Sequence, residues 1–578
     1  MTESFQPFAR RLLRSPWLAA ALVSMAVSAA IVSPFFFFGN ASGHDIEFHA
    51  SSWMDVAYQW KEGILFPRWT EWANYGYGEP RFIFYPPLSR LIGAALGLLF
   101  PWTAVASISI FLVQSFSGVS AYALVRRFAP HRPALLGASF YTANLNALLI
   151  IYLRSDYAEL LATAFYPLLL LACLNLCGWQ TGTNQSTRRN IVFFALALAG
   201  VWLANAPAGV IATYAVTFVF AWAAYNQRSW LPLARGAGGL ALGLGLCAFY
   251  LIPAAFEERW VNIGQALSSG LAPADNFLFT NINDPDHNAF NFLASSVALL
   301  LMFMIFCAIL AGWHRLRSAS GDLTRRAAPA AWQALLALAA LSALLMCPFT
   351  LPLWKALPEL RFVQFPWRWM SILALAFSVF CAVALVRRRR LWIWACIIFL
   401  LLGGAGTYLG TTGWWDEGDF PSVQDAITQG QGFEGTDEYD PRGDDHLDLP
   451  QNQPQAKLLP ANPAANSQPD AKFHVERWTA EDRRITVDAR QPVRLAIRLL
   501  DYPAWRVTLN GKRVEAIHEG TTRAMYLALE PGTSHVEIRF ARTPDRIVGG
   551  YASLAALLAA GLLWYFPEQK QPASGGQQ

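Results

Sequence analysis

The chain has 578 residues, of which 54% are apolar and only 14% are charged, whereas charged residues make up about 25% of an ordinary soluble protein. The composition therefore excludes an ordinary soluble protein and indicates that lipid surrounds much of the chain. The net charge of +5 does not indicate a nucleic-acid partner, because the arginines form short clusters between apolar runs, where membrane topology explains them. All seven cysteines lie in apolar runs, which predicts neither a disulfide framework nor a zinc site.

Apolar runs long enough to cross a bilayer as helices, about 20 residues each, recur along the chain. The first run follows three arginines, Arg10, Arg11 and Arg14. It lacks a small-residue cleavage motif, so we expect a retained span rather than a signal peptide. A shorter run at residues 88–100 is expected to lie in the outer interface. About twelve spans are predicted, at residues 17–38, 102–125, 134–153, 158–177, 190–205, 207–226, 231–253, 291–312, 331–349, 367–386, 391–410 and 547–566.

Every second loop between these runs is rich in arginine. Such loops stay in the cytoplasm, so we expect both chain termini to be cytoplasmic and residues 39–101, 254–290 and 411–546 to lie outside it. The basic clusters are Arg10, Arg11 and Arg14; Arg126, Arg127 and Arg132; Arg188 and Arg189; Arg228 and Arg235; Arg315, Arg317, Arg325 and Arg326; and residues 387–390.

The largest outer segment changes composition twice. An acidic stretch gives way to a Pro/Gln/Asn/Ala-rich stretch at residues 449–471, expected to be an extended linker. Alternating β-formers and an Asn510-Gly511 turn then predict a small β-sandwich, in which Trp478, Trp505 and Tyr526 belong to the core or stack on sugars. The fold class is a polytopic α-helical membrane protein with an extracytoplasmic β-sandwich before the last span. The predicted parts are 1–410, 411–471, 472–546 and 547–578.

Two carboxylates and two imidazoles follow the first span, at His44, Asp45, Glu47 and His49. This set at the outer membrane surface suits a general base or a metal ligand. The alternative is that Asp45 only caps a helix that begins at Ile46. Zinc is not predicted, because the two histidines are not spaced to share one helical face.

Charged residues in the second outer loop leave two interpretations open. Glu257, Glu258, Arg259 and residues 284–287 either belong to a lid over the site or are solvated loop charges. Near the outer ends of other spans, Asp156 and Glu159 share one helical face, where charged side chains are costly unless they pair or serve a site.

Four motifs in the first outer loop carry a family resemblance. They are the acidic pair after the first span, a Gly-x-x-x-Pro-Arg-Trp step, a Tyr-Gly-x-Gly-x-Pro turn and a Tyr-Pro-Pro-Leu entry to the next helix, which suit a rigid loop on lipid headgroups. With them the chain resembles the YfhO-like membrane proteins, also labelled 6-pyruvoyl-tetrahydropterin-synthase-related, which are similar to GT-C glycosyltransferases. Further matching motifs lie at residues 154–159, 364–368, 438–439, 502–505 and 510–512.

One departure from the family pattern lies at residues 203–207, which read Leu-Ala-Asn-Ala-Pro. In such proteins we expect His-Asn-Pro, so a role for histidine there is lost or moved. The pterin label implies little, because nothing in this chain supplies the histidine site of the pterin synthases.

The resemblance implies transfer of a sugar from a polyprenyl-phosphate donor to a glycan, lipid or protein acceptor at the outer face of a bacterial plasma membrane. It assigns Asp45 as base or metal ligand, with Glu47 as the second candidate. Either Mg²⁺ or Mn²⁺ suits such oxygen ligands, and a metal-free base mechanism fits equally. For the donor phosphate we expect Arg154, Arg361 and Arg368. The expected acceptor-binding or supporting residues are His44, His49, Asp156, Glu159 and Gln364.

Other interpretations remain open at this stage. Each arginine could instead anchor at the interface or pair, for example Arg154 with Asp156 or Glu159. A transporter or lipid flippase would have a similar number of spans, although we see no two halves of matching hydropathy. A non-catalytic envelope assembly protein would use the β-domain to bind a partner.

Overall fold

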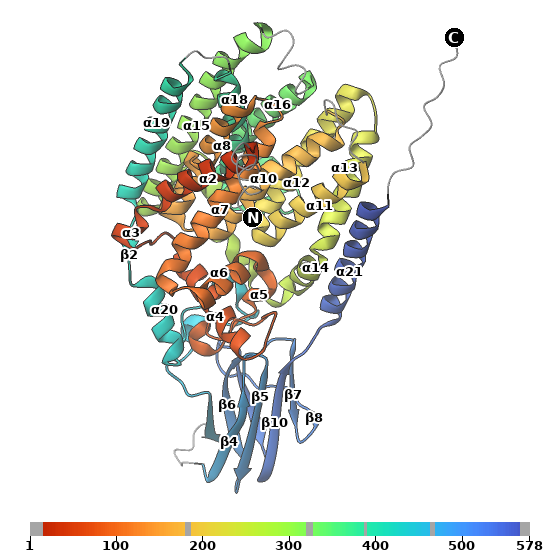
Figure 1. The fold of residues 1–578 in the computed structure, drawn as a ribbon. Helices are drawn as coiled ribbons and strands as arrows, with labels where there is room; N and C mark the ends of the chain where they lie inside the picture. The colour runs from red at the N-terminus through yellow and green to blue at the C-terminus, as the bar shows by residue number, and fades with distance from the viewer. Residues whose placement is uncertain (1–14, 180–186, 319–327, 387–389, 463–468, 567–578) are drawn as a thin grey trace, which may run out of the picture.

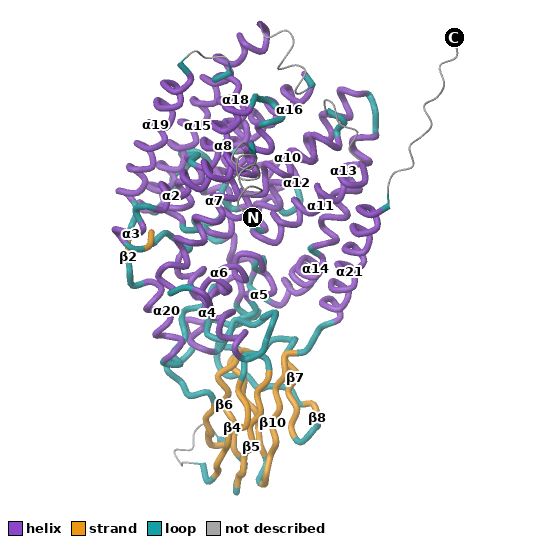
Figure 2. Tube along the Cα trace, viewed as in Figure 1, coloured by secondary structure: helices purple, strands orange, loops and turns teal. Residues whose placement is uncertain are grey.

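The computed structural model describes residues 15–179, 187–318, 328–386, 390–462 and 469–566. Long helices form a bundle, and the β-strands project from one end of it together with the short helices α4, α5, α6 and α20 (Figure 1). Coloured by secondary structure, the same view separates a purple helical body from an orange strand region, with teal loops between them (Figure 2). The predicted basic residues Arg10, Arg11, Arg14, Arg325 and Arg326 lie outside the described residues.

The helical bundle confirms the predicted membrane protein. Within the described residues, ten helices are long and apolar enough to cross a membrane, and two bent pairs raise the number to twelve if each counts as one span. The bundle helices are α2 (Pro16–Val32), α3 (Phe35–Phe38), α7 (Trp102–Val125), α8 (His131–Thr142), α9 (Leu145–Leu149), η2 (Ile150–Arg154), α10 (Tyr157–Leu176), α11 (Thr187–Ala204), α12 (Ala206–Gln227), α13 (Leu231–Leu246), α14 (Ala248–Glu257), α15 (Pro285–Ser318), α16 (Pro329–Leu345), α18 (Met370–Ala384), α19 (Leu391–Thr412) and α21 (Pro544–Tyr565).

Two predicted spans are bent rather than straight. The helices of the predicted span 231–253 meet at 76°, and those of 331–349 meet at 93°. In the second pair the chain turns at η6, which begins at Pro348, a residue that cannot donate the amide hydrogen bond a continuing helix needs. Hydropathy reports the length of an apolar run but not its direction, so neither bend was predicted. The turn is made of η6 (Pro348–Thr350) and α17 (Leu351–Ala356).

The end of the bundle that we expect to lie outside the cytoplasm is built from short elements. Helix α6 (Pro87–Leu99) is a short apolar helix over the residues expected to lie in the interface, 88–100. The first outer loop also contains α4 (Ile46–Lys61), η1 (Asn74–Gly76) and α5 (Arg81–Phe84). The remaining outer elements are η3 (Glu258–Trp260), η4 (Ile263–Leu267), η5 (Pro273–Asp275), η7 (Leu360–Val363), η8 (Pro366–Trp369), α20 (Asp419–Thr428), η9 (Asp437–Tyr439) and η10 (His446–Asp448).

Two antiparallel sheets form the expected β-sandwich, with strand orders β4-β5-β10-β7-β8 and β3-β6-β9. Asn510 (φ 50°) and Gly511 (φ 77°) make the predicted tight hairpin turn. Strand β3 comes from the stretch expected to be a linker and pairs with β6. The strands are β3 (Ala456–Pro460), β4 (Ala471–Trp478), β5 (Asp482–Ala489), β6 (Val493–Leu500), β7 (Trp505–Leu509), β8 (Lys512–Arg513), β9 (Ala524–Leu529) and β10 (Gly532–Phe540), and a separate pair joins β1 (Asn40–Ala41) to β2 (Trp415–Asp416).

The aromatic residues of the sandwich belong to its core. Trp505 is buried, and Trp478 and Tyr526 pack partly buried against the same hydrophobic cluster. The core interpretation of these three side chains is therefore the one the structure supports.

The β-sandwich is fixed to the first outer loop through Trp69. This side chain is fully buried, and its ring centroid lies 5.3 Å from that of Trp505 and 5.6 Å from that of Phe540. The backbone of Gly78 (φ +77°) packs directly against this ring. A Cβ at this position would lie 2.0 Å from the indole nitrogen, so no residue with a side chain fits there. We expected this Gly-rich turn to lie on lipid headgroups; instead it is the platform on which the β-sandwich docks.

A buried ion pair joins the sandwich to the last span. Glu257 is fully buried, and its carboxylate accepts hydrogen bonds from Arg546 Nε (2.6 Å) and from the Tyr502 hydroxyl (2.7 Å). Glu257 is therefore neither a lid residue nor a solvated loop charge. In the same loop, Asp284 accepts hydrogen bonds from the backbone amides of Asp286 and His287 at the start of α15.

We predict that Trp69→Ala destabilises the docking of the β-sandwich, because removing a fully buried indole costs about 3–5 kcal/mol. Limited proteolysis of the full chain in nanodiscs should release the sandwich faster, and the melting temperature should fall. Trp414→Ala is the matched control, since that side chain is 73% exposed. Equal proteolysis rates for the two variants would contradict this account.

Candidate functional site

The loop that carries the predicted acidic pair is pinned to the outer end of α10. The Ser155 hydroxyl donates to the Ala41 carbonyl (2.7 Å) and accepts from the Gly43 amide (3.1 Å). The Asp45 amide donates to the Arg154 carbonyl (2.8 Å). Gly43 is needed for this approach, because a Cβ there would lie 2.6 Å from both the Leu153 carbonyl oxygen and the Arg154 carbonyl carbon.

A buried ion-pair network begins beside this contact. Asp156 caps α10 by accepting the Glu159 amide (2.8 Å), and its second oxygen lies 3.1 Å from Arg154 Nη2. Glu159 Oε2 lies 2.5 Å from Arg154 Nη1 and 2.9 Å from Arg368 Nε. These four side chains are at most 7% exposed. The alternative interpretation, in which Arg154 pairs with these acids, is the one that the structure shows, and Arg368 completes the network from η8.

Aromatic rings and a strained glutamine surround the two guanidinium groups. Arg154 lies over the Trp367 ring (4.9 Å) and Arg368 over the Phe365 ring (4.8 Å). Gln364 has φ 65°, a conformation that non-glycine residues rarely adopt. Its Oε1 accepts from Arg368 Nη1 (3.4 Å), and its Nε2 donates to the Ala266 carbonyl (2.8 Å). Gln364 thereby connects the network to the second outer loop.

Asp45 is the accessible carboxylate of this network. It stands at the N-cap position of α4, but its side chain makes no capping hydrogen bond, so the capping interpretation does not account for it. Its Oδ2 lies 3.6 Å from Arg154 Nη2, and the side chain keeps 39% of its surface exposed. The many protein atoms around it nevertheless bury the carboxyl enough to raise its pKa, and the charge of Asp156 raises the pKa further. Asp45 is thus crowded by protein atoms and still reached by solvent.

The charges of the network do not balance. Three carboxylates, those of Asp45, Asp156 and Glu159, meet two guanidinium groups. Asp156 and Glu159 each contact both arginines, so Asp45 is the surplus acid. A surplus carboxylate with a raised pKa can accept a proton or bind a cation.

His49 and Tyr85 border the same network. The Tyr157 amide donates to His49 Nε2 (3.2 Å), and the same nitrogen lies 3.6 Å from Asp156 Oδ1. Burial raises the pKa of the Tyr85 phenol, and the charges of Asp156 and Asp45 add to that effect, so Tyr85 is a neutral hydrogen-bond donor near both acids. Sequence reasoning noticed Tyr85 only as part of a motif, because its partners lie far away in the chain.

The remaining predicted residues lie outside the network. Glu47 is exposed. His44 is exposed too and packs edge-on against Phe290, with ring centroids 4.7 Å apart. Arg361 is exposed and lies over the Phe362 ring. Of the predicted residues, Asp45, His49, Arg154, Asp156, Glu159, Gln364 and Arg368 are brought together.

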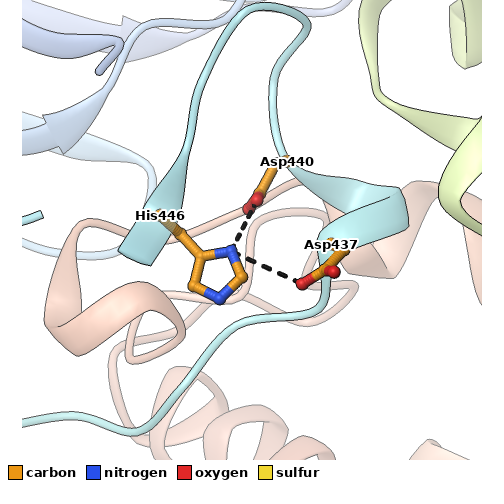
Figure 3. A group of neighbouring side chains, drawn as sticks. All are labelled: Asp437, Asp440 and His446. Atoms are coloured by element: carbon orange, nitrogen blue, oxygen red, sulfur yellow. Dashed lines mark hydrogen bonds and ion pairs between the residues drawn. The ribbon is translucent and has the colours of Figure 1, made fainter. Parts of the chain in front are cut away.

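A second cluster, Asp437, Asp440 and His446, has side chains of the kinds that bind metals (Figure 3). His446 Nδ1 lies 2.7 Å from Asp440 Oδ2 and 3.7 Å from Asp437 Oδ1. The hydrogen bond with Asp440 raises the pKa of His446 to about 9, so at neutral pH a protonated imidazole already supplies the positive charge. Asn74 of the first outer loop donates to Asp440 (3.0 Å). We therefore interpret the cluster as an ion pair that holds residues 437–446 on that loop.

We predict that Gly43→Ala displaces Asp45 from Arg154, because a methyl group would overlap the Arg154 backbone. Overpacking of this kind costs about 1–3 kcal/mol, so the melting temperature should fall. Gly550→Ala is the control, since a Cβ there meets nothing within 4 Å. A variant that melts like the wild type would show that the contact is looser than described.

The His446 ion pair should also make stability depend on pH. The folded pKa of about 9 exceeds the unfolded value of about 6.5, so the stabilisation is complete below about pH 6.5 and is lost as the pH rises through about 9. The melting temperature of the wild type should therefore fall more between these pH values than that of His446→Gln. His474→Gln, at an exposed histidine, should behave like the wild type; an identical fall in all three proteins would refute the ion pair.

Two of the solved structures similar to this chain are named as transferases. The mycobacterial arabinofuranosyltransferase AftD matches with 17% identity and a TM-score of 0.40 over 68% of this chain and 26% of its own. The oligosaccharyltransferase AglB of Archaeoglobus fulgidus, in complex with an inhibitory peptide and a dolichol-phosphate, matches with 14% identity and a TM-score of 0.39 over 74% of this chain and 57% of its own. The chain thus spans only part of the length of either protein. A comparison with curated proteins finds no match.

The comparison with protein families matches residues 82–410 to the model described as "6-pyruvoyl-tetrahydropterin synthase related domain; membrane protein". The match covers more than half of the 578 residues and includes α10, η8 and thus the centre of the ion-pair network. The chain therefore belongs to the 6-pyruvoyl-tetrahydropterin synthase related family of membrane proteins.

Proposed function

We propose that this protein is a membrane glycosyltransferase that moves a sugar from a polyprenyl-phosphate donor to an acceptor hydroxyl at the extracytoplasmic face of a bacterial plasma membrane. The observation that supports the proposal best is the surplus, solvent-reached carboxylate of Asp45 beside a buried ion-pair network. A group-transfer site needs such a base held rigidly at the membrane surface, where a lipid-linked donor can reach it.

In the proposed reaction, the acceptor oxygen attacks the anomeric carbon of the sugar. The Asp45 carboxylate takes the proton of the acceptor hydroxyl as the new C–O bond forms. The bond between the anomeric carbon and the phosphate oxygen breaks, and the polyprenyl phosphate leaves with its electron pair. The raised pKa of Asp45 favours this proton transfer, because a base is more effective when its pKa lies nearer the working pH.

The other residues of the site have supporting roles in this proposal. Arg154 fixes Asp45 from one side, at 3.6 Å, while its own charge is shared with Asp156 and Glu159. Tyr85 would orient the acceptor, and the buried His49 would support the network through Asp156, 3.6 Å away. Glu47 is exposed at the start of α4 and would join Asp45 if Mg²⁺ or Mn²⁺ takes part, since both cations prefer oxygen ligands. Loss of activity with a chelator, and its return with either ion, would identify the metal-dependent form of the mechanism.

Transport is the second candidate function, and the position of the charges argues against it. Transporters bind their substrates near the middle of the bilayer, between repeats. Here the buried network lies at the start of α10 and just before α18, the ends of these helices that meet the first outer loop. The proposed orientation, with both termini cytoplasmic, places this end outside the cytoplasm.

We predict that Asp45→Asn lowers sugar transfer about 100-fold or more, since removing a general base typically has an effect of this size. The measurement is release of polyprenyl phosphate from a panel of radiolabelled polyprenyl-phosphate sugars by the protein in nanodiscs. Asp425→Asn is the control, because Asp425 is exposed on α20 and forms no ion pair within the described residues. Full activity of a correctly folded Asp45→Asn protein would exclude the proposed base, and absence of release with every donor would exclude the proposed reaction.

A further inference from the structure

A cavity of about 480 Å³ lies just beyond the outer end of α14. Its walls come from residues 258–265 of the second outer loop and from Arg442 of the largest outer segment. The polar side chains in these walls include Arg259, Asn262, Gln265 and Arg442, with one carboxylate, Glu258. From the sequence, Arg259 was only one of the charges that could belong to a lid or a solvated loop, and Arg442 had no expected role.

The arginines of this cavity differ from those of the buried network. Arg259 and Arg442 are exposed, and neither forms an ion pair with a carboxylate among the described residues. Arg154 and Arg368, by contrast, are buried and each contacts at least two carboxylates. A phosphate approaching Arg154 or Arg368 would have to displace those acids, whereas the cavity offers guanidinium groups that are free to bind an oxyanion bidentately.

Interfacial anchoring explains Arg259 but not Arg442. Arg259 lies at the end of α14 with its guanidinium 3.8 Å from the Phe256 ring centroid, as an arginine at a membrane surface commonly does. Arg442 follows η9 in the outer segment, so membrane topology requires no positive charge there. Its backbone amide donates to the Trp260 carbonyl (2.8 Å), which holds the two arginine-bearing segments together.

Further hydrogen bonds hold the wall of the cavity in place. The Asn262 amide donates to the Asp440 carbonyl (3.0 Å), and Val261 forms an isolated β-bridge with Pro441. The Asn262 side chain donates to the Asp444 carbonyl (3.3 Å). The His446 ion pair secures the same segment on the first outer loop. The cavity is therefore assembled from segments fixed to one another.

Gln364 connects this cavity to the candidate site. Its side chain bonds at one end to Arg368 of the network and at the other to the Ala266 carbonyl, and Ala266 directly follows Gln265 of the cavity wall. Gln364 thus links Arg368 of the network to the residue that follows the cavity wall.

We infer that the cavity of Arg259 and Arg442 binds the phosphate group of a prenyl-phosphate carrier lipid. Its position at the outer end of a membrane helix suits a phosphate whose hydrocarbon tail stays in the bilayer. This assignment deepens the proposed function by naming a phosphate subsite, but its test measures binding and does not depend on transfer.

The test is equilibrium binding of radiolabelled farnesyl phosphate to the full chain in phosphatidylcholine nanodiscs. Replacing Arg259→Gln and Arg442→Gln together should weaken binding about 10- to 100-fold, since two charge-assisted contacts are removed. The matched control is Arg506→Gln with Arg513→Gln, two exposed arginines of the β-sandwich, which should bind like the wild type. Farnesol, which has the same tail without the phosphate, should not distinguish the two double variants.

Each outcome decides the inference. Equal affinity of the wild type and the Arg259/Arg442 variant, or no binding by the wild type, overturns it. Displacement by phosphatidylglycerol as effective as displacement by unlabelled farnesyl phosphate assigns the cavity to bulk headgroups and overturns the carrier assignment. Asp45→Asn should bind normally. If the wild type shows the expected binding but transfers no sugar, the proposed reaction fails while the phosphate site stands.

Discussion

The architecture of the outer end depends on the buried ion pairs of Arg154 and Arg368 with Asp156 and Glu159. Burying an ion costs several kcal/mol, and removing one partner of such a pair costs about 3–5 kcal/mol, because the other charge is left unpaired. The network therefore strongly favours one arrangement of η2, α10 and η8. The loop with Asp45 is bonded to the same residues through Ser155 and the Arg154 carbonyl. The network therefore holds the backbone of Asp45 in place, although the Asp45 side chain contacts fewer arginines than Asp156 or Glu159 does.

The composition and the spacing of apolar residues were enough to predict the elements whose positions are set by contact with lipid or water. Apolar runs predicted the spans and the short apolar helix α6, since lipid requires every backbone group to be satisfied inside a helix. Asn510-Gly511 predicted the hairpin, because its backbone geometry suits a tight turn between twisted strands. Local spacing also offered the pairing of Arg154 with Asp156 or Glu159 as the alternative to a phosphate-binding role. The pairing of Arg368 with these acids and the place of Tyr85 beside them were not predicted, because the partners lie far away in the chain. His446 lies only six residues from Asp440, but the irregular stretch between them has no periodicity that would indicate the contact.

The surplus carboxylate of the network and the arginines of the cavity lie in different regions of the outer surface, and this arrangement suits phosphate chemistry. The network around Asp45 has one carboxylate more than its arginines can balance, while the neighbouring cavity has two guanidinium groups without carboxylate partners in the described part of the chain. A base placed in a positive site would lose its basicity, and a phosphate placed among carboxylates would be repelled. Gln364, which is neutral, links Arg368 of the network to Ala266, next to the cavity wall. Proton transfer and phosphate binding are thus assigned to two different groups of side chains.

The central claim is that the donor binds at this outer end, with its reacting carbon at Asp45. The most direct measurement is a cryo-EM structure of the protein in nanodiscs with a non-transferable phosphonate analogue of a polyprenyl-phosphate sugar. The account predicts sugar density beside Asp45 and Tyr85, with the phosphonate on the side of Gln364 that faces Arg259 and Arg442. Density for the analogue at the opposite end of the bundle, or between its helices at mid-membrane depth, would contradict it.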